Sequence, residues 1–390
     1  MTRPRGKGDG AHAGPALSFE IDGCGTLSLL GADERTESYV RSQMNPCVPS
    51  AAPAPPDVVL EAVEESAPRT FADVQNPAGD AIVTASDGEG FYLVRDGLSC
   101  KLPDSFRDRP ARFSADPGFP VERIFGPVVR PVLQISALDR DSVVLHSASV
   151  VVDGAGVIVA GWSETGKTET ALALIERGAV FLSDKWTVVR PDGTIAVFPI
   201  SVGVRRWVLP YLPRLRSSLP AAARAQFMVA GMLSAAARPA RLLSTRGRVA
   251  DLAQTALERA TMLADRAALS PTQVREAYDQ RPATSWSAEL RVVAHLTTVS
   301  DTRIEAKPAD PAWAARRLAR SAAFERRATF ELYERRRFAF PDSQAPSLED
   351  VVHAEERLLE RAFANALVLD VRAPFPTDPR PVAEAIARFL

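Results

Sequence analysis

The stretch from residue 157 to residue 184 constrains the fold more than any other part of this sequence. An apolar run, Val157 to Ala160, leads into the loop Gly-Trp-Ser-Glu-Thr-Gly-Lys-Thr at 161–168, and a helical pattern follows as far as Arg177. The loop fits the pattern G-x-x-x-x-G-K-[ST] in the strand-to-helix context that the pattern requires. Glycines let the backbone N–H groups converge on an anion, and the helix adds its positive N-terminal end. The sequence therefore predicts a phosphate-binding loop between a buried strand and a helix.

The residue types in this loop match the needs of a bound nucleotide. Lys167 is expected to reach the β and γ phosphates, and the hydroxyl of Thr168 is expected to bind Mg²⁺. An ordinary glycine-containing turn is the alternative, but lysine occurs only at positions 7, 101, 167, 185 and 307, so a chance match is rare. The full set expected to contact the nucleotide is Gly161, Ser163, Glu164, Thr165, Gly166, Lys167, Thr168 and Glu169.

A carboxylate follows at the end of the next apolar strand. Ala179 to Ser183 is this strand, and it leads into Asp184. A carboxylate at the carboxyl end of the strand that comes one helix after the loop lies close to the γ-phosphate and its metal. There it can bind Mg²⁺ or accept a proton from an attacking hydroxyl. The alternative is a capped turn before Trp186 that has no chemical role.

Charge and cysteine content argue against several classes of protein. The net charge is −1 over 390 residues, which gives no bulk attraction to nucleic acid or to an anionic membrane. Three widely spaced cysteines, Cys24, Cys47 and Cys100, favour a reducing compartment over a disulfide scaffold or a cysteine zinc site. No run reaches the roughly 18 apolar residues of a membrane helix. We therefore expect a cytoplasmic protein with neither a nucleic-acid nor a membrane partner.

The pattern of elements predicts a mixed fold. Residues 1–14 are polar and glycine-rich and are expected to form a disordered tail, and residues 15–115 are expected to form a small β-rich region. Residues 116–390 are expected to form the nucleotide domain, with a helical insertion at about 205–285. The best helix of this insertion is Leu252 to Ala268, and the insertion either shapes a substrate site or forms an outer layer. The expected fold class is α/β around the loop and α+β overall.

Charged residues continue in a long helical pattern from Pro311 to about Arg337. Its many arginines either face an anion or form an ordinary solvated helix face, which is the commoner role of such runs.

Three segments together resemble a known family. They are H-x-x-x-V-V-V-D-G at 146–154, G-x-S-x-x-G-K-T-E-T-A-L-x-L-x-x-R-G at 161–178 and L-x-D at 182–184. The glutamate directly after the loop threonine, and the Arg-Gly pair before the aspartate strand, are more specific than the loop alone. These segments resemble the HPr kinase/phosphorylase family and its kinase-like relatives, over residues 146 to 189.

The resemblance implies a P-loop, HPr-kinase-like domain and an ATP-dependent kinase that phosphorylates a hydroxyl, commonly a serine, with Mg²⁺. By position, Lys167 and Thr168 bind phosphates and metal, and Asp184 is a base and a metal ligand. His146 matches a histidine that helps to orient the reacting groups, although a histidine in an apolar strand is by itself more often a core residue. The implied partner is a hydroxyl-bearing peptide, protein or small molecule. Members of the family often form homo-oligomers.

The chain departs from the family beside the expected base. Asp184-Lys185 stands where paired aspartates are common, which removes a carboxylate and adds a cation. This departure motivates a second hypothesis, a nucleotide-binding regulatory module with little or no catalysis. A third hypothesis is an ATPase that drives a conformational change.

Overall fold

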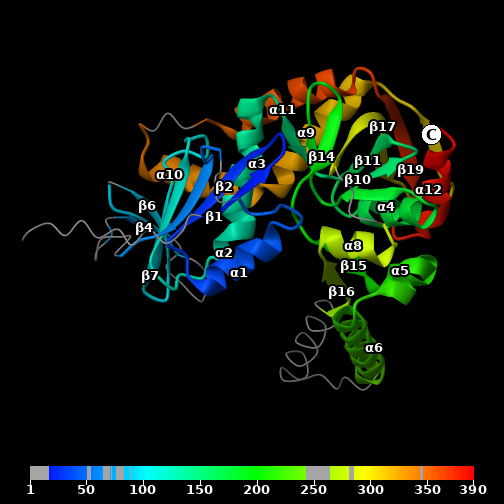
Figure 1. The fold of residues 1–390 in the computed structure, drawn as a ribbon, viewed down its shortest axis with the longest axis horizontal. Coiled ribbons are helices and arrows are strands. Elements are labelled where there is room, and N and C mark those ends of the chain that lie inside the picture. Colours follow the sequence, from blue (N-terminus) through cyan, green and yellow to red (C-terminus); the bar gives the residue numbers. More distant parts are fainter. Residues whose placement is uncertain are drawn as a thin grey trace, which may run out of the picture. The chain divides into compact units, whose positions relative to one another are not determined.

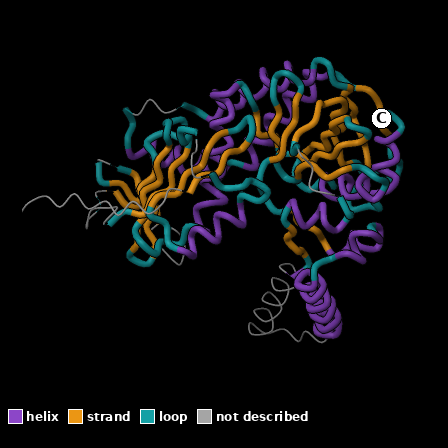
Figure 2. Tube along the Cα trace, viewed as in Figure 1, coloured by secondary structure: helices purple, strands orange, loops and turns teal. Residues whose placement is uncertain are grey.

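The chain divides into two units, which Figures 1 and 2 draw as ribbon and trace. Unit 1 draws on the described parts of Met1–Arg41, Cys47–Ser136 and Arg326–Leu348, and unit 2 on those of Ser42–Pro46, Ala137–Glu325 and Glu349–Leu390. The expected tail at 1–14 lies outside the described residues. The computed structural model describes residues 17–50, 54–64, 71, 73–75, 83–88, 90–242, 264–280, 285–342 and 346–390. For residues 233–242 it describes the backbone alone.

Unit 1 contains an eight-stranded sheet in the order β1-β2-β3-β8-β7-β6-β5-β4. β1 and β2 form an antiparallel hairpin, whereas β3 is parallel to both β2 and β8. Parallel neighbours need a crossover, and helix α1 (Glu34–Gln43) supplies it between β2 and β3. The strands are β1 (Leu17–Ile21), β2 (Gly25–Leu30), β3 (Val58–Ala62), β4 (Asp73–Gln75), β5 (Val83–Ser86), β6 (Phe91–Arg95), β7 (Leu98–Leu102) and β8 (Ala111–Ala115).

A broken helix follows the strands of unit 1. Pro127 and Pro131 interrupt it, because proline lacks the N–H that a regular helix needs. Its pieces are α2 (Glu122–Ile124), a π-helical turn (Phe125–Val129), α3 (Arg130–Ile135) and a 3₁₀ turn (Ser136–Arg140).

Unit 1 also includes a segment from much later in the chain, Arg326–Leu348. The buried Arg326 donates from Nε to Oε1 of Gln134 at 3.1 Å. Phe330 and Tyr333 pack edge-on against Phe106, with ring centres 5.6 and 5.3 Å away. The expectation of one helix from Pro311 to Arg337 is therefore wrong: α9 (Pro311–Glu325) ends where the chain leaves unit 2, and α10 (Arg327–Ala339) begins in unit 1. Unit 1 also extends as far as Ser136, beyond the boundary expected near residue 115.

Unit 2 contains a nine-stranded mixed sheet around one long strand. β17 is parallel to β11 on one side and to β19 on the other, and its first residues also pair with β14. β10 and β11 form an antiparallel hairpin. The strands are β9 (Val143–Leu145), β10 (Ser147–Val152), β11 (Ala155–Gly161), β12 (Val180–Ser183), β13 (Thr187–Val189), β14 (Thr194–Val197), β17 (Ser287–Thr298), β18 (Glu305–Pro308) and β19 (Leu367–Ala373).

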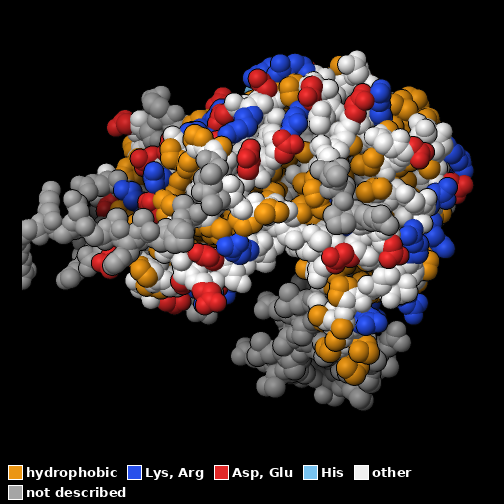
Figure 3. Space-filling view, in the orientation of Figure 1, with side chains coloured by type: hydrophobic (Ala, Val, Ile, Leu, Met, Phe, Trp, Pro, Cys, Tyr) orange, Lys and Arg blue, Asp and Glu red, His pale blue; other side chains and the backbone are white. Residues whose placement is uncertain are grey.

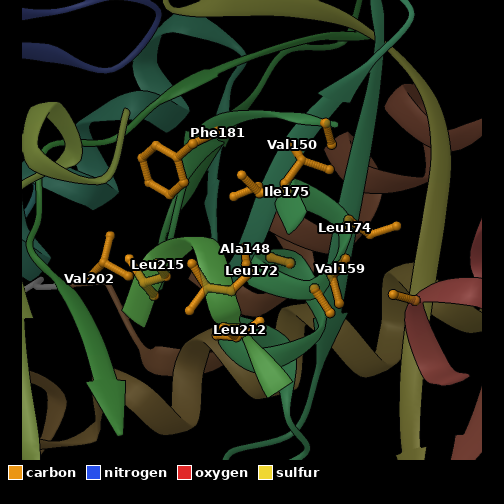
Figure 4. Close-up of a cluster of buried hydrophobic side chains, with 14 of the residues drawn as sticks. Ala148, Val150, Val159, Leu172, Leu174, Ile175, Phe181, Val202, Leu212 and Leu215 are labelled. Atoms are coloured by element: carbon orange, nitrogen blue, oxygen red, sulfur yellow. The ribbon is translucent and has the colours of Figure 1, made fainter. Parts of the chain in front are cut away.

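Helices cover both faces of this sheet. On one face, α4 (Lys167–Glu176) and α12 (Pro379–Ala387) pack against each other. Figure 4 shows Leu172 and Ile175 of α4 beside Val150 and Val159 of the sheet, all within one buried apolar cluster. Side chains alternate along a strand, so the other residues of β11 face the opposite side, where α9 contacts β9, β11 and β19. A further helix of this unit is α11 (Leu348–Phe363).

The region 205–285 is only partly helical. Its described helices are α5 (Pro213–Ser218), α6 (Ala221–Leu242) and α8 (Pro271–Ala277), with a 3₁₀ turn at Arg206–Tyr211. However, β16 (Arg266–Leu269) pairs antiparallel with β15 (Val202–Arg205). The expected helix Leu252 to Ala268 is therefore wrong at residues 266–268. These residues belong to a strand in which alternate side chains, those of Ala267 and Leu269, are buried. Residues 252–263 lie outside the described residues.

The surface shows two further features. On the face drawn in Figure 3, basic and acidic side chains of the described residues lie interspersed, and apolar side chains gather over α6. Met228 and Met232 of this helix are 65% and 64% exposed. None of the helices in the described residues combines the length and apolar character that crossing a membrane requires.

Candidate functional site

Two glycines shape the loop between β11 and α4. A Cβ at Gly161 would lie 2.5 Å from the carbonyl oxygen of Leu296 on the neighbouring strand β17, so a larger residue would push the two strands apart. Gly166, the residue before α4, has φ of 87°, which is the left-handed conformation that glycine adopts without strain. The sequence therefore folds here into a turn that other residues would not permit.

The backbone of this loop has unused donors. Among the described residues, the N–H groups from Ser163 to Gly166 donate to no protein acceptor. Unpaired N–H groups ahead of a helix, together with the helix dipole, form a binding site for an anion. This geometry suits a phosphate group.

Lys167 lies over the same loop. Its Nζ donates to the carbonyl oxygen of Trp162 at 2.5 Å and to that of Gly161 at 3.4 Å. Burial lowers the pKa of Lys167 to about 8, and the carboxylates of Glu325, Asp184 and Glu169 act in the opposite direction. An ammonium group held by carbonyls alone can turn to a phosphate that enters the loop.

A hydroxyl and a carboxylate meet beside the loop. Thr168 donates from Oγ1 to Oδ1 of Asp184 at 2.8 Å, and Asp184 is only 4% exposed. Burial raises the pKa of Asp184, while the hydrogen bonds from Thr168 and from the Lys185 backbone N–H, and the charges of Arg266 and Lys167, lower it. The adjacent Glu169 is also buried, which raises its pKa.

These oxygens fit Mg²⁺. That ion usually takes one or two carboxylates together with substrate phosphates and water, and Thr168 and Asp184 supply a hydroxyl and a carboxylate at one point. The part of the chain that the structure describes holds no group of three or more His, Cys, Asp or Glu side chains placed to bind a metal. A nucleotide-bound Mg²⁺ does not require one.

His146 reaches the site from between β9 and β10. Its ring lies 5.3 Å from that of Trp186, and Nδ1 is 3.4 Å from Oγ of Ser321 and 3.9 Å from Oε1 of Glu325. Ser321 in turn donates to the carbonyl oxygen of Gly161 at 3.0 Å. His146 is therefore connected to the loop through one serine of α9.

One cavity of about 210 Å³ brings the expected residues together. Gly161 lies behind the loop, at the end of β11, and every other expected residue lines the cavity. Those residues are His146, Ser163, Glu164, Thr165, Gly166, Lys167, Thr168, Glu169 and Asp184.

Several lining residues come from segments that sequence reasoning did not connect with the loop. Arg205 and Arg266 come from β15 and β16, Glu325 ends α9, and Phe375 follows β19. Phe375 packs on the loop, since a Cβ at Gly166 would lie 3.0 Å from its ring. No motif marks these positions, and Arg266 lies in a segment whose pattern indicates a helix.

A polar network lies on β17, which pairs with the loop strand β11, and on β19, which pairs with the other edge of β17. Thr297 donates from Oγ1 to Oδ1 of Asp370 at 3.1 Å and lies 3.3 Å from Nδ1 of His295. Arg372 donates to the other oxygen of Asp370 at 2.9 Å. Burial, reinforced by the positive charge of Arg317, lowers the pKa of His295 to about 4. The imidazole is therefore neutral at pH 7.

Unit 1 has a cavity of its own, of about 220 Å³, where β2, β3 and β8 end. Three of its carboxylates already have partners. Asp33 accepts from the N–H of Thr36 at 2.7 Å, Asp116 accepts from the N–H and the hydroxyl of Ser99, and Glu61 accepts from the hydroxyl of Ser114.

Comparison with models of protein families finds no match, and comparison with curated protein sequences finds none either.

Proposed function

We propose that this protein is an ATP-dependent kinase that transfers the γ-phosphoryl group to a hydroxyl, commonly that of serine, on a peptide, a protein or a small molecule. We also propose that unit 2 has an HPr-kinase-like fold and that the protein acts in the cytoplasm. The observation that carries the proposal is the hydrogen bond between Thr168 and Asp184, next to Lys167 and the unpaired N–H groups of the loop.

In the proposed complex, the loop N–H groups and Lys167 hold the phosphates. Thr168 and Asp184 would hold Mg²⁺, which neutralises phosphate charge when it is bound. The carboxylate of Asp184 accepts the proton of the acceptor hydroxyl. The hydroxyl oxygen then bonds to the γ-phosphorus, the bond from that phosphorus to the bridging oxygen breaks, and ADP leaves with the electron pair. His146, which also lines the cavity, orients the reacting groups.

The second candidate is a nucleotide-binding regulatory module with little catalysis. The observation that favours it is Lys185, which lines the cavity next to Asp184 and occupies the position where the resembled family commonly has a second aspartate. A cation there attracts the negative charge of a phosphate, which favours binding over transfer.

The test of the kinase proposal is transfer of ³²P from γ-labelled ATP to a panel of serine-containing peptides, with alanine versions of the same peptides as blanks. Replacing Asp184 with Asn removes the base and should slow transfer by roughly 10²- to 10⁴-fold. The matched control is Asp153→Asn, an exposed aspartate in the turn at the other end of β11, and it should transfer at the wild-type rate.

Equal rates for Asp184→Asn and wild type would refute the role of Asp184 as base. ATP binding with no transfer and no hydrolysis would favour the regulatory module. ADP release that does not depend on any acceptor would instead indicate an ATPase.

A further inference from the structure

Arg266 occupies a place that a glycine keeps open. Its guanidinium lies across Gly203 of the neighbouring strand: a Cβ built on Gly203 would lie 2.0 Å from Nε and 2.4 Å from Cζ of Arg266. Gly203 itself does not have a left-handed φ, so its backbone conformation does not need glycine. A larger residue at position 203 would instead force the guanidinium of Arg266 to leave this place.

The residues around Arg266 favour the binding of an anion beside its guanidinium. Arg205 lies directly opposite it in the β15–β16 ladder, and like charges at opposite positions destabilise a sheet. Arg205 is paired with Glu164 at 3.3 Å. Within the described part of the chain, by contrast, the guanidinium of Arg266 forms no hydrogen bond or ion pair.

Arg266 also lies on the reacting side of the cavity. It lines the same cavity as Thr168 and Asp184, and its charge acts on the carboxylate of Asp184. In the proposed reaction, Asp184 stands next to the γ-phosphorus. The donors of the Arg266 guanidinium therefore lie on the side of the cavity where the phosphoryl group would move.

We propose that Arg266 is a catalytic residue that binds the phosphoryl group during transfer, and that Gly203 is the positioning residue that leaves its guanidinium free to do so. This inference rests on the proposed kinase function. The transferred phosphoryl group spreads negative charge over three equatorial oxygens, and the planar guanidinium can donate to two of them at once. An arginine supplied in this way stabilises the transition state more than it stabilises bound ATP.

The test measures binding and not turnover. The affinity of each protein is measured calorimetrically for MgADP and for MgADP with aluminium fluoride, which imitates the phosphoryl group in transfer. Arg266→Met and Arg266→Lys remove the guanidinium, and Gly203→Ala keeps it but displaces it. Gly231→Ala in α6 is the matched glycine control, because its added Cβ meets no atom closer than 3.8 Å. Arg291→Met, at an exposed ion pair on β17, is the arginine control.

We expect MgADP affinity to stay within about twofold of wild type in all five variants, because a group that binds only the moving phosphoryl leaves ground-state binding unchanged. Binding of the fluoroaluminate complex should weaken by roughly 100-fold or more in both Arg266 variants and to a smaller extent in Gly203→Ala, and should be unchanged in the two controls. Wild-type affinity for the fluoroaluminate complex in Arg266→Met, or an equal loss of both affinities, would overturn the proposal. If wild-type protein does not bind MgADP, the proposed function itself fails and this inference fails with it.

Discussion

Both units form a cavity where parallel strands end, but the two cavities differ in what remains unpaired. In unit 1, the carboxylates of Asp33, Asp116 and Glu61 already accept hydrogen bonds from the chain. In unit 2, among the described residues, the N–H groups from Ser163 to Gly166 donate to no protein acceptor, and the guanidinium of Arg266 forms no hydrogen bond or ion pair. The carboxyl ends of parallel strands determine where such a cavity forms, whereas the polar groups left without partners determine what it can bind.

The sharpest way to break this comparison is to remove the lysine of the loop. Lys167→Ala deletes the ammonium group that contacts the loop itself, through the carbonyl oxygen of Trp162, and we expect MgATP to bind roughly 100-fold more weakly or worse. Calorimetric titration with MgATP measures the effect. Lys307→Ala, an exposed lysine on β18 of the same unit, should bind as wild type does. Unchanged MgATP affinity in Lys167→Ala would mean that the polar groups of the unit 2 cavity do not make it a better nucleotide site than the cavity of unit 1.

The second prediction concerns the loss of stability of unit 2 at acidic pH, through protonation of His295. His295 has a pKa of about 4 in the folded protein and about 6.5 when unfolded, so between these values only the unfolded chain takes up the proton. The contribution of the neutral His295 to stability is therefore fully present above pH 6.5 and is lost as the pH falls towards 4. At pH 5 the loss is about 2 kcal/mol, from 1.36 kcal/mol for each of the roughly 1.5 units below 6.5.

Hydrogen exchange localises this loss. Each protein is compared at pH 7 and pH 5 after correction for the intrinsic exchange rate. In wild type, protection in β11, β17 and β19 should fall at pH 5, while protection in β2, β3 and β8 should change less. His295→Asn keeps a donor near Thr297 but cannot be protonated, so its loss between the two pH values should be smaller. A variant that loses as much as wild type would contradict the assignment to His295.

The smallest effect is expected at the cavity of unit 1. Asp33→Ala removes the side-chain oxygen that accepts from the N–H of Thr36 at the start of α1, which should cost about 1 kcal/mol of unfolding free energy. Denaturant unfolding measures it, and Asp33→Asn should recover most of the loss. MgATP affinity should be unchanged, because the role of this carboxylate is structural. A parallel loss of nucleotide affinity would show that the two cavities are not as different as their hydrogen bonds indicate.

The residues of the phosphate-binding loop and Asp184 could be predicted from the sequence, but the cavity residues from distant segments could not. The loop glycines, Lys167, Thr168 and Asp184 belong to one strand-loop-helix-strand segment, in which chain connectivity alone brings the parts together. His146 was found only because a family resemblance extends to it. Arg266 and Glu325 arrive from distant segments through strand pairing and helix packing, which no local pattern encodes.

The same limit explains the errors in the fold. Arg326 reads as one more solvated arginine in a charged helix, but its burial against Gln134 divides the run between two units. Arg266 to Leu269 follows an alanine-rich helical pattern, but β15 offers an open edge with which this segment pairs. In both cases a tertiary contact outweighs the local propensity.

The long excursion between β15 and β16 leaves and returns at adjacent points. Arg206 donates from its N–H to the carbonyl oxygen of Asp265 at 2.9 Å, and its Nε lies 2.8 Å from the carboxylate of the same residue. A segment whose ends are joined in this way can lengthen, shorten or be exchanged at little entropic cost to the framework that carries it. Between related genes, residues 207–264 are therefore the natural place for rapid divergence. For protein engineers, the Arg206–Asp265 pair marks a site at which a foreign module can be grafted next to β15 and β16, whose Arg205 and Arg266 line the cavity of unit 2.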